Sequence, residues 1–158
     1  STIVYNGTCV FEGTNISEGR GTTVPFEMVG APFINATELA KALNDFGLKG
    51  VFFQEAYFTP TFSKHADVAC QGVKLHILNR NTFEPVKTGW CMLDTIRRIY
   101  ANDFKVLPPY VEGGNRMLEF NTGNKLIASG QMPLEEQLQI LKTDKETFAT
   151  TRKKYLLY

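Results

Sequence analysis

Side chains that could carry out acid–base chemistry gather in a glycine-rich stretch near the start of the chain, residues 11–26. Glu12 and Glu18 could act as a general acid and a general base, because glycoside cleavage uses two carboxylates placed on either side of the bond. Arg20 offers forked N–H donors that suit a carboxylate ligand. Each group also has a purely structural use, since the glutamates could bond loop amides or pair with Arg20.

A second polar stretch, residues 59–66, contains Ser63, Lys64 and His65. The imidazole of His65 could shuttle a proton, because histidine titrates near neutral pH. Ser63 lies only two positions before it, which does not indicate a nucleophile–base pair without a third group to orient the histidine. His76 falls within an expected strand, so we interpret it as an ordinary strand residue.

The three cysteines, Cys9, Cys70 and Cys91, lie far apart beside apolar residues, and we expect buried free thiols. One disulfide with one cysteine left over is the alternative. The histidines and cysteines lack paired ligand spacing, so no metal site is predicted. The chain also lacks a Walker or dinucleotide-binding fingerprint, and we expect no cofactor.

The composition describes a chain of balanced charge and one-domain size. Its 158 residues include 17 basic and 16 acidic side chains, which give a formal net charge of +1. This balance argues against nucleic acid as a partner, because such proteins present a basic face. The sequence has no run of ~18 apolar residues, so no membrane span is predicted. We therefore expect residues 1–158 to form a single domain.

The first polar stretch lies between two predicted elements. Residues 3–11 are rich in β-branched and aromatic side chains and predict a strand, which Gly7 could interrupt. Further on, Asn35 is a good helix N-cap and Glu38 completes a capping-box-like pair. Apolar residues then recur at helical spacing up to Gly47, so this segment predicts a helix.

The second polar stretch lies between two predicted strands, residues 48–58 and 72–78. A predicted helix follows, which opens at Val86 or Thr88, runs to about Tyr100 and carries a buried apolar stripe. Strands and helices thus alternate without a strict βαβ rhythm. We predict an α+β fold with a small mixed or antiparallel sheet, about three main helices and long polar loops.

The C-terminal third is predicted to be mostly irregular and helical. Short helices are expected at residues 117–120 and 126–128, and Pro133 is placed like the first-turn proline of the last helix. The apolar face of that helix would consist of Leu134, Leu138, Leu141 and Phe148. The closing residues 155–158 are apolar enough that we expect them to dock on the domain.

Several motifs occur in order along the chain. They are CVFEGTNISEGRGT at 9–22, PF at 25–26, GAPF at 30–33, FTPTFSKHA at 58–66, CQGV at 70–73, TG at 88–89 and YLLY at 155–158. This series closely resembles the signature of a bacterial two-domain family, long labelled only as a domain of unknown function and now described as exo-acting β-N-acetylmuramidases. The resemblance covers nearly the whole chain. Phe33 stands where the family commonly has tryptophan, so an aromatic side chain is kept.

The resemblance implies that this chain is the C-terminal domain of a two-domain enzyme whose N-terminal, Rossmann-like domain is absent. Such enzymes release N-acetylmuramic acid from the non-reducing ends of peptidoglycan fragments and recycle the cell wall. The active site is expected in the cleft between the domains, with the main catalytic glutamate on the N-terminal one. This chain alone is then expected to be inactive, and its parent to be periplasmic or extracytoplasmic.

By this resemblance, the chain supplies one wall of the pocket for a muropeptide or amino-sugar ligand. The catalytic candidates on this chain are Glu12 and His65. The candidates for substrate binding are Asn15, Ser17, Arg20, Thr22, Ser63, Lys64 and His65. We expect Arg20 or Lys64 to face the lactyl carboxylate of the sugar, on grounds of charge complementarity.

Two other functions remain open at this point. The chain could be a non-catalytic interface or carbohydrate-binding module, with Phe26, Phe33, Phe58 and Phe62 as apolar anchors. It could also be a complete enzyme that uses Glu12 and Glu18 as its carboxylate pair. An exposed apolar patch would favour the interface module, and a concave polar site would favour the half-site.

Overall fold

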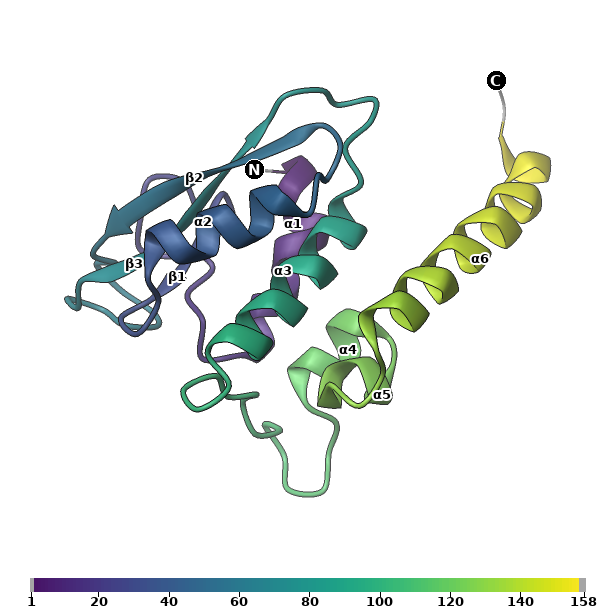
Figure 1. The fold of residues 1–158 in the computed structure, drawn as a ribbon. Coiled ribbons are helices and arrows are strands. Elements are labelled where there is room, and N and C mark those ends of the chain that lie inside the picture. The colour runs from purple at the N-terminus through teal and green to yellow at the C-terminus, as the bar shows by residue number, and fades with distance from the viewer. Residues whose placement is uncertain (1, 157–158) are drawn as a thin grey trace.

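A computed structural model describes residues 2–156 (Figure 1). Its elements in chain order are α1 (Thr2–Thr8), the 3-10 helix η1 (Cys9–Gly13), β1 (Met28–Ala31), α2 (Ala36–Asp45), β2 (Val51–Phe58), β3 (Cys70–Ile77), α3 (Pro85–Ile99), α4 (Met117–Thr122), α5 (Lys125–Ser129), α6 (Leu134–Arg152) and the 3-10 helix η2 (Lys153–Tyr155). One small sheet lies among these helices, which confirms the predicted α+β fold.

The sheet has three antiparallel strands in the order β1-β3-β2. Its buried face carries Val29, Phe53, Val73 and Leu75, since Val29 pairs with Val73 and Phe53 with Leu75. Helix α2 lies across the sheet, and these side chains belong to one hydrophobic core cluster with those of α2 and α3 (Figure 1). The sheet is therefore the rigid layer from which the two polar loops extend.

The free edge of β2 is partly covered by a side chain of α2. The Asn44 amide donates to the carbonyl of Phe53 at 2.9 Å and accepts from its N–H at 3.0 Å. The unpaired N–H and C=O groups of an exposed strand edge can pair with a strand of another chain. Because the Asn44 amide bonds both backbone groups of Phe53, they are not available for such pairing.

The predicted strand at residues 3–11 is wrong, because this segment forms α1 and η1. The reason is a close crossing of α1 and α3. A Cβ added at Gly7 would lie 2.0 Å from the carbonyl oxygen of Pro85, and one at Gly89 would lie 2.1 Å from the carbonyl oxygen of Gly7. Gly7 therefore permits a helix contact rather than interrupting a strand.

Most other predicted elements are confirmed. Asn35 caps α2, and its side chain accepts from the Glu38 N–H at 3.0 Å. The Glu38 carboxylate does not complete the capping box, and instead accepts from the Tyr100 hydroxyl at 3.1 Å. The two middle strands, α3, α4, α5 and the start of α6 lie where the sequence predicted them. The short strand β1 was not predicted.

The predicted packing of the C-terminal segment is only partly confirmed. Leu134, Leu138 and Leu141 of α6 are half-buried, but the Phe148 side chain is 64% exposed. Tyr155 and Leu156 are 72% and 50% exposed, so their predicted docking is wrong, and residues 157–158 lie outside the described range. Figure 1 shows the second half of α6 standing away from the sheet and the other helices.

The cysteines are free, as predicted. Cys70 and Cys91 are buried, and Cys9 is half-buried. Burial raises the pKa of the Cys91 thiol to about 11. Within residues 2–156, no helix combines the length and hydropathy needed to cross a bilayer.

Candidate functional site

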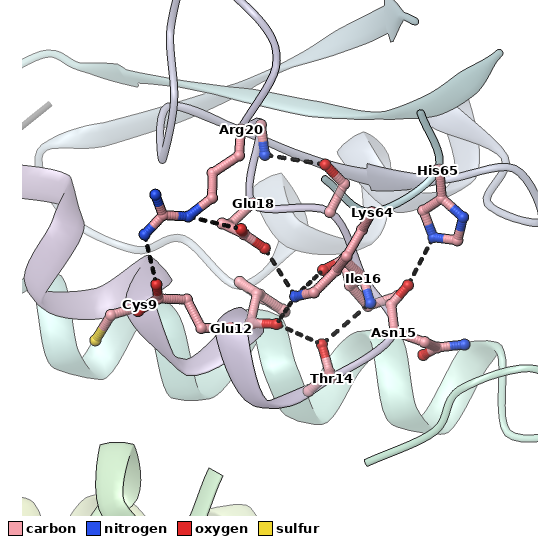
Figure 2. A network of polar contacts seen from close by, with 12 residues as sticks. Cys9, Glu12, Thr14, Asn15, Ile16, Glu18, Arg20, Lys64 and His65 are labelled. Atoms are coloured by element: carbon pink, nitrogen blue, oxygen red, sulfur yellow. Dashed lines mark hydrogen bonds and ion pairs between the residues drawn. The ribbon is translucent and has the colours of Figure 1, made fainter. Parts of the chain in front are cut away.

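The two polar stretches meet beside η1, where Lys64 joins them (Figure 2). Its ammonium donates to the carbonyls of Phe11 at 2.7 Å and Ile16 at 3.0 Å, and to Oε2 of Glu18 at 2.8 Å. Three acceptors match the three protons of an ammonium group. Lys64 therefore fixes the β2–β3 connection against the first loop.

Glu18 is the buried centre of this contact, with a side chain only 3% exposed. Its second oxygen, Oε1, accepts from Arg20 Nε at 3.1 Å. Arg20 also donates through Nη2 to Oε1 of Glu12 at 2.7 Å, so its guanidinium bridges the two glutamates. We call these four residues, Glu12, Glu18, Arg20 and Lys64, the ion-pair network. Its two carboxylates and two cations balance in charge.

The network has a closed side and an open side. Lys64 is largely buried, and burial lowers its pKa, an effect that the nearby Glu18 and Glu12 oppose. Arg20 and Glu12 have side chains 45% and 25% exposed. The hydrogen bond to Glu12 raises the pKa of Arg20, so the guanidinium stays charged. The Arg20 guanidinium also lies over the Phe26 ring, 5.0 Å from its centroid.

His65 lies on the same side of the first loop, with Nε2 2.7 Å from the carbonyl oxygen of Asn15 (Figure 2). A carbonyl can only accept, so Nε2 carries a proton and Nδ1 is the ring position that can accept one. The Asn15 side chain faces the other way. It donates to the carbonyl of Asp103 and accepts from the N–H of Lys105, both at 2.8 Å.

The backbone around His65 is strained. Ser63, His65 and Asp67 have φ angles of 73°, 58° and 60°, in the left-handed region that residues with a Cβ seldom adopt. Each such residue costs on the order of 1 kcal/mol or more, and such strain clusters at functional sites. The Lys64 contacts and the hydrogen bond from Asp67 N to the Pro60 carbonyl, at 2.8 Å, hold this conformation.

Two of the remaining predicted residues, Ser17 and Thr22, use their hydroxyls within the first loop. Ser17 is buried, and its Oγ accepts from the Gly19 N–H at 3.1 Å. Thr22 Oγ1 donates to the Gly19 carbonyl at 2.6 Å. The Ser63 side chain is exposed. The structure thus brings Glu12, Glu18, Arg20, Lys64 and His65 together, while Asn15, Ser17 and Thr22 shape the loop that carries them.

One contact at the site was missed by sequence reasoning. The N–H and the hydroxyl of Thr61 both donate to the carbonyl of Gly21 at 3.0 Å. A Cβ at Gly21 would lie 2.6 Å from the Phe62 carbonyl oxygen, and its φ is +83°. The signal available in the sequence was the Gly19-Arg20-Gly21 run, which indicates close backbone approach but not its partner.

The four phenylalanines considered as interface anchors do not form one exposed patch. Phe26 is buried and packs edge-on against Tyr5, with ring centroids 4.7 Å apart. Phe33 and Phe58 are half-buried, and only Phe62, 61% exposed, faces solvent. Among residues 2–156, no group of three His, Cys, Asp or Glu side chains could hold a metal ion.

Comparison with known proteins identifies related sequences over the whole chain. Residues 3–158 match the family described as "Exo-beta-N-acetylmuramidase NamZ, C-terminal". The chain is 46% identical over all 158 residues to a protein of Bacillus subtilis (strain 168) named "Peptidoglycan beta-N-acetylmuramidase NamZ". It spans 37% of that protein, so well over half of the relative lies outside the matched region.

Two crystal structures share the fold, both of DUF1343 family proteins from Bacteroides fragilis NCTC 9343. One superposes with a TM-score of 0.81 at 24% identity, covering 99% of this chain and 41% of the other. The second superposes with a TM-score of 0.58 at 22% identity, covering 99% and 40%. These similarities establish the fold, and they too place it within longer chains.

Proposed function

The chain belongs to the NamZ family of exo-β-N-acetylmuramidases, whose C-terminal region it matches, and from this premise we propose that it forms one wall of an interdomain active site. The proposed reaction is release of N-acetylmuramic acid from the non-reducing ends of peptidoglycan fragments. A preceding domain, Rossmann-like by family resemblance, would supply the main catalytic glutamate. Residues 1–158 would then be a single domain that does not turn over substrate alone.

The observation that carries this proposal is the half-exposed guanidinium of Arg20. Glu18 holds its Nε from the buried side. The contacts with Glu18 and Glu12 engage two nitrogens of the guanidinium, and other N–H donors of the group are left for a ligand. N-acetylmuramic acid differs from other amino sugars by a lactyl carboxylate, and arginine binds carboxylates through paired hydrogen bonds. In this proposal Arg20 binds that carboxylate, and Lys64, with all three protons engaged, positions the loop.

The open side of the network also carries the catalytic candidates. Glu12 is partly exposed beside Arg20, so its carboxylate can reach a bound sugar. His65 can accept a proton at Nδ1 because its Nε2 donates to Asn15. Under this proposal both groups assist a glutamate of the other domain.

The burial of Glu18 argues against a complete enzyme built on Glu12 and Glu18. Both Glu18 oxygens are engaged, one by Lys64 and one by Arg20, and the side chain is 3% exposed. A carboxylate that protonates a leaving group or attacks a sugar must contact the glycosidic bond. Glu18 is therefore proposed as a positioning residue that orients Arg20.

A carbohydrate-binding module without catalysis is the second candidate, because the exposed Phe62 ring lies on the same strained loop as His65. Aromatic rings commonly present an apolar face to ligands at binding sites. The two candidates differ in their kinetics. A half-site changes turnover when it is altered, whereas a separate binding module changes only retention on peptidoglycan.

The first test uses the two-domain parent with a chromogenic β-N-acetylmuramide. We expect Arg20→Ala to raise KM by roughly 10- to 100-fold, since hydrogen bonds to charged groups contribute about 1.5–3 kcal/mol. Arg80→Ala, at an exposed arginine away from the network, is the matched control. A chromogenic β-N-acetylglucosaminide, which lacks the lactyl group, should show little difference between Arg20→Ala and the parent.

An unchanged KM for the muramide in Arg20→Ala would refute the assigned role of Arg20. A companion assay compares this chain alone, the parent, and the two domains mixed. Activity only when the preceding domain is present supports a shared cleft, and activity of this chain alone would restore the complete-enzyme alternative.

A further inference from the structure

The second half of α6 has no buried residue, and the one ion pair that the structure shows between it and the rest of the described chain is the exposed Lys145–Glu84 contact at 2.8 Å. Every residue from 142 to 152 is exposed, and Gln137 is the one buried residue of the helix. Figure 1 shows this part of α6 projecting past the start of α3. A helix derives most of its stability from packing one face against a core, and this segment lacks such a contact.

Local interactions do not replace that packing. None of the ion pairs found among residues 2–156 joins two α6 side chains. The segment contains Thr143, Thr147, Thr150 and Thr151, and threonine is a weak helix former. A helix that is polar nearly all round either bridges domains, is stabilised by many internal ion pairs, or is unstable. The first option fits this sequence.

An apolar groove runs between the start of α3 and α6. It has a volume of about 530 Å³. Five apolar residues line it, Phe83, Pro85, Val86, Leu141 and Phe148, and four charged residues stand among them, Glu84, Lys87, Asp144 and Lys145. Phe83 is buried at its base, while the Phe148 ring is 64% exposed on the α6 side. Tyr155 and Leu156, which follow α6 in the chain, are also exposed. A single exposed ring is ordinary, but an exposed ring that continues an apolar groove is typical of a surface that another protein segment covers.

We propose that an apolar element of the domain preceding residue 1 in the full polypeptide docks in this groove, against Phe148 and the second half of α6. Most of the related protein lies outside the matched C-terminal region, so a large preceding segment is available to cover this surface. That segment would join this chain through α1, which packs on the start of α3 at Gly7 and Pro85. The start of α3 also forms one wall of the groove, so the preceding segment joins the chain in the same part of the molecule.

This proposal shares the preceding domain with the proposed function, but it needs no substrate and no catalytic residue. The test is hydrogen–deuterium exchange on the full two-domain protein, followed at the amides of residues 142–152. In the parent we expect protection of these amides well above that of a solvated helix end. Phe148→Asp should raise their exchange rate at least about tenfold, because a carboxylate opposes burial of this surface.

The matched control is Thr150→Asp, which adds the same charge about 200° further around the helix, away from the groove. We expect its exchange rates to stay within about twofold of the parent. Unprotected amides in the parent, or equal effects of the two variants, would overturn the proposal. The experiment is repeated at several protein concentrations. Protection that is lost on dilution would also overturn the proposal, because it would mean that a second copy of the protein occupies the groove. Loss of muramidase activity does not enter the readout.

Discussion

Two regions of the molecule each contain a lysine–glutamate ion pair, and the distance from nitrogen to oxygen is the same in both. Lys64 and Glu18 at the site, and Lys145 and Glu84 between α6 and the start of α3, are each joined at 2.8 Å. The side chains of the first pair are 20% and 3% exposed, and those of the second are 69% and 47% exposed. The distance between charges is therefore a poor guide to what each pair contributes.

The partners around each pair explain the difference. Lys64 also donates to two backbone carbonyls, and Glu18 also accepts from Arg20. Removing Lys64 leaves buried acceptors unsatisfied, whereas water can replace Lys145 at an exposed carboxylate. The structure is thus rigid where it positions Arg20 and weakly connected where α6 is proposed to receive another domain.

The largest predicted effect comes from Lys64→Met, which keeps the apolar stem but removes the charge. We expect it to lower the free energy of unfolding by about 2–3 kcal/mol, because the buried Glu18 would keep only Arg20, which it shares with Glu12, and two backbone carbonyls would lose their donor. Urea unfolding of the chain, followed by circular dichroism, measures this change.

The exposed Lys49→Met is the control for this substitution and should change stability by less than about 0.5 kcal/mol. If Lys64→Met were as mild as Lys49→Met, burial would not distinguish the two regions. Under the proposed function, Lys64→Met in the full-length protein should also weaken turnover, since Lys64 no longer holds the loop that carries His65 against the first loop.

The sequence predicted what depends on local spacing. The N-cap at Asn35, the helical periodicity of α3 and the alternation in β3 are decided within a few residues, and the structure confirms them. The strand predicted at residues 3–11 failed because its decisive partner, Gly89, lies far along the chain. The close crossing of α1 and α3 at Gly7 and Gly89 outweighs the β propensity of residues 3–11, and the residues around Gly7 alone do not indicate this contact.

The sequence indicated which residues form the site, but not which of them pair with one another. Arg20, Lys64 and Glu18 stood out as charged groups in polar loops, yet which carboxylate pairs with which cation depends on how the β2–β3 connection folds back. Ser17 and Thr22 look equally suited to bind a sugar, but their hydroxyls satisfy loop amides and carbonyls. Phe148 fits the α6 periodicity, and nothing in a sequence of this domain alone shows what it faces.

A second prediction concerns an uncharged contact between the two polar loops, where Gly21 lies against Thr61 and Phe62. Gly21→Ala should lower the free energy of unfolding by about 2 kcal/mol, because its Cβ meets the Phe62 backbone and its φ is +83°. Gly47→Ala is the matched control, since φ there is +64° and no atom lies within 4 Å of the added Cβ. We expect about 1 kcal/mol from that variant. Equal losses in thermal or urea unfolding would mean that the contact with Phe62 adds nothing.

The smallest predicted effect comes from Lys145→Met, at the exposed pair. Its expected cost at pH 7 is a few tenths of a kcal/mol, because solvent screens the charges and the long side chains lose freedom when they pair. Lys145 lowers the pKa of Glu84 below its ordinary 4.5, so the contribution is present above that value and is lost as pH falls through the lower, folded-state pKa. Urea unfolding of the unchanged chain and of Lys145→Met should therefore show a small difference in the free energy of unfolding at pH 7, and this difference should disappear near pH 3. A loss above about 1 kcal/mol at pH 7 would mean that this pair alone holds α6 firmly against α3, and the case for a second domain covering the groove would weaken with it.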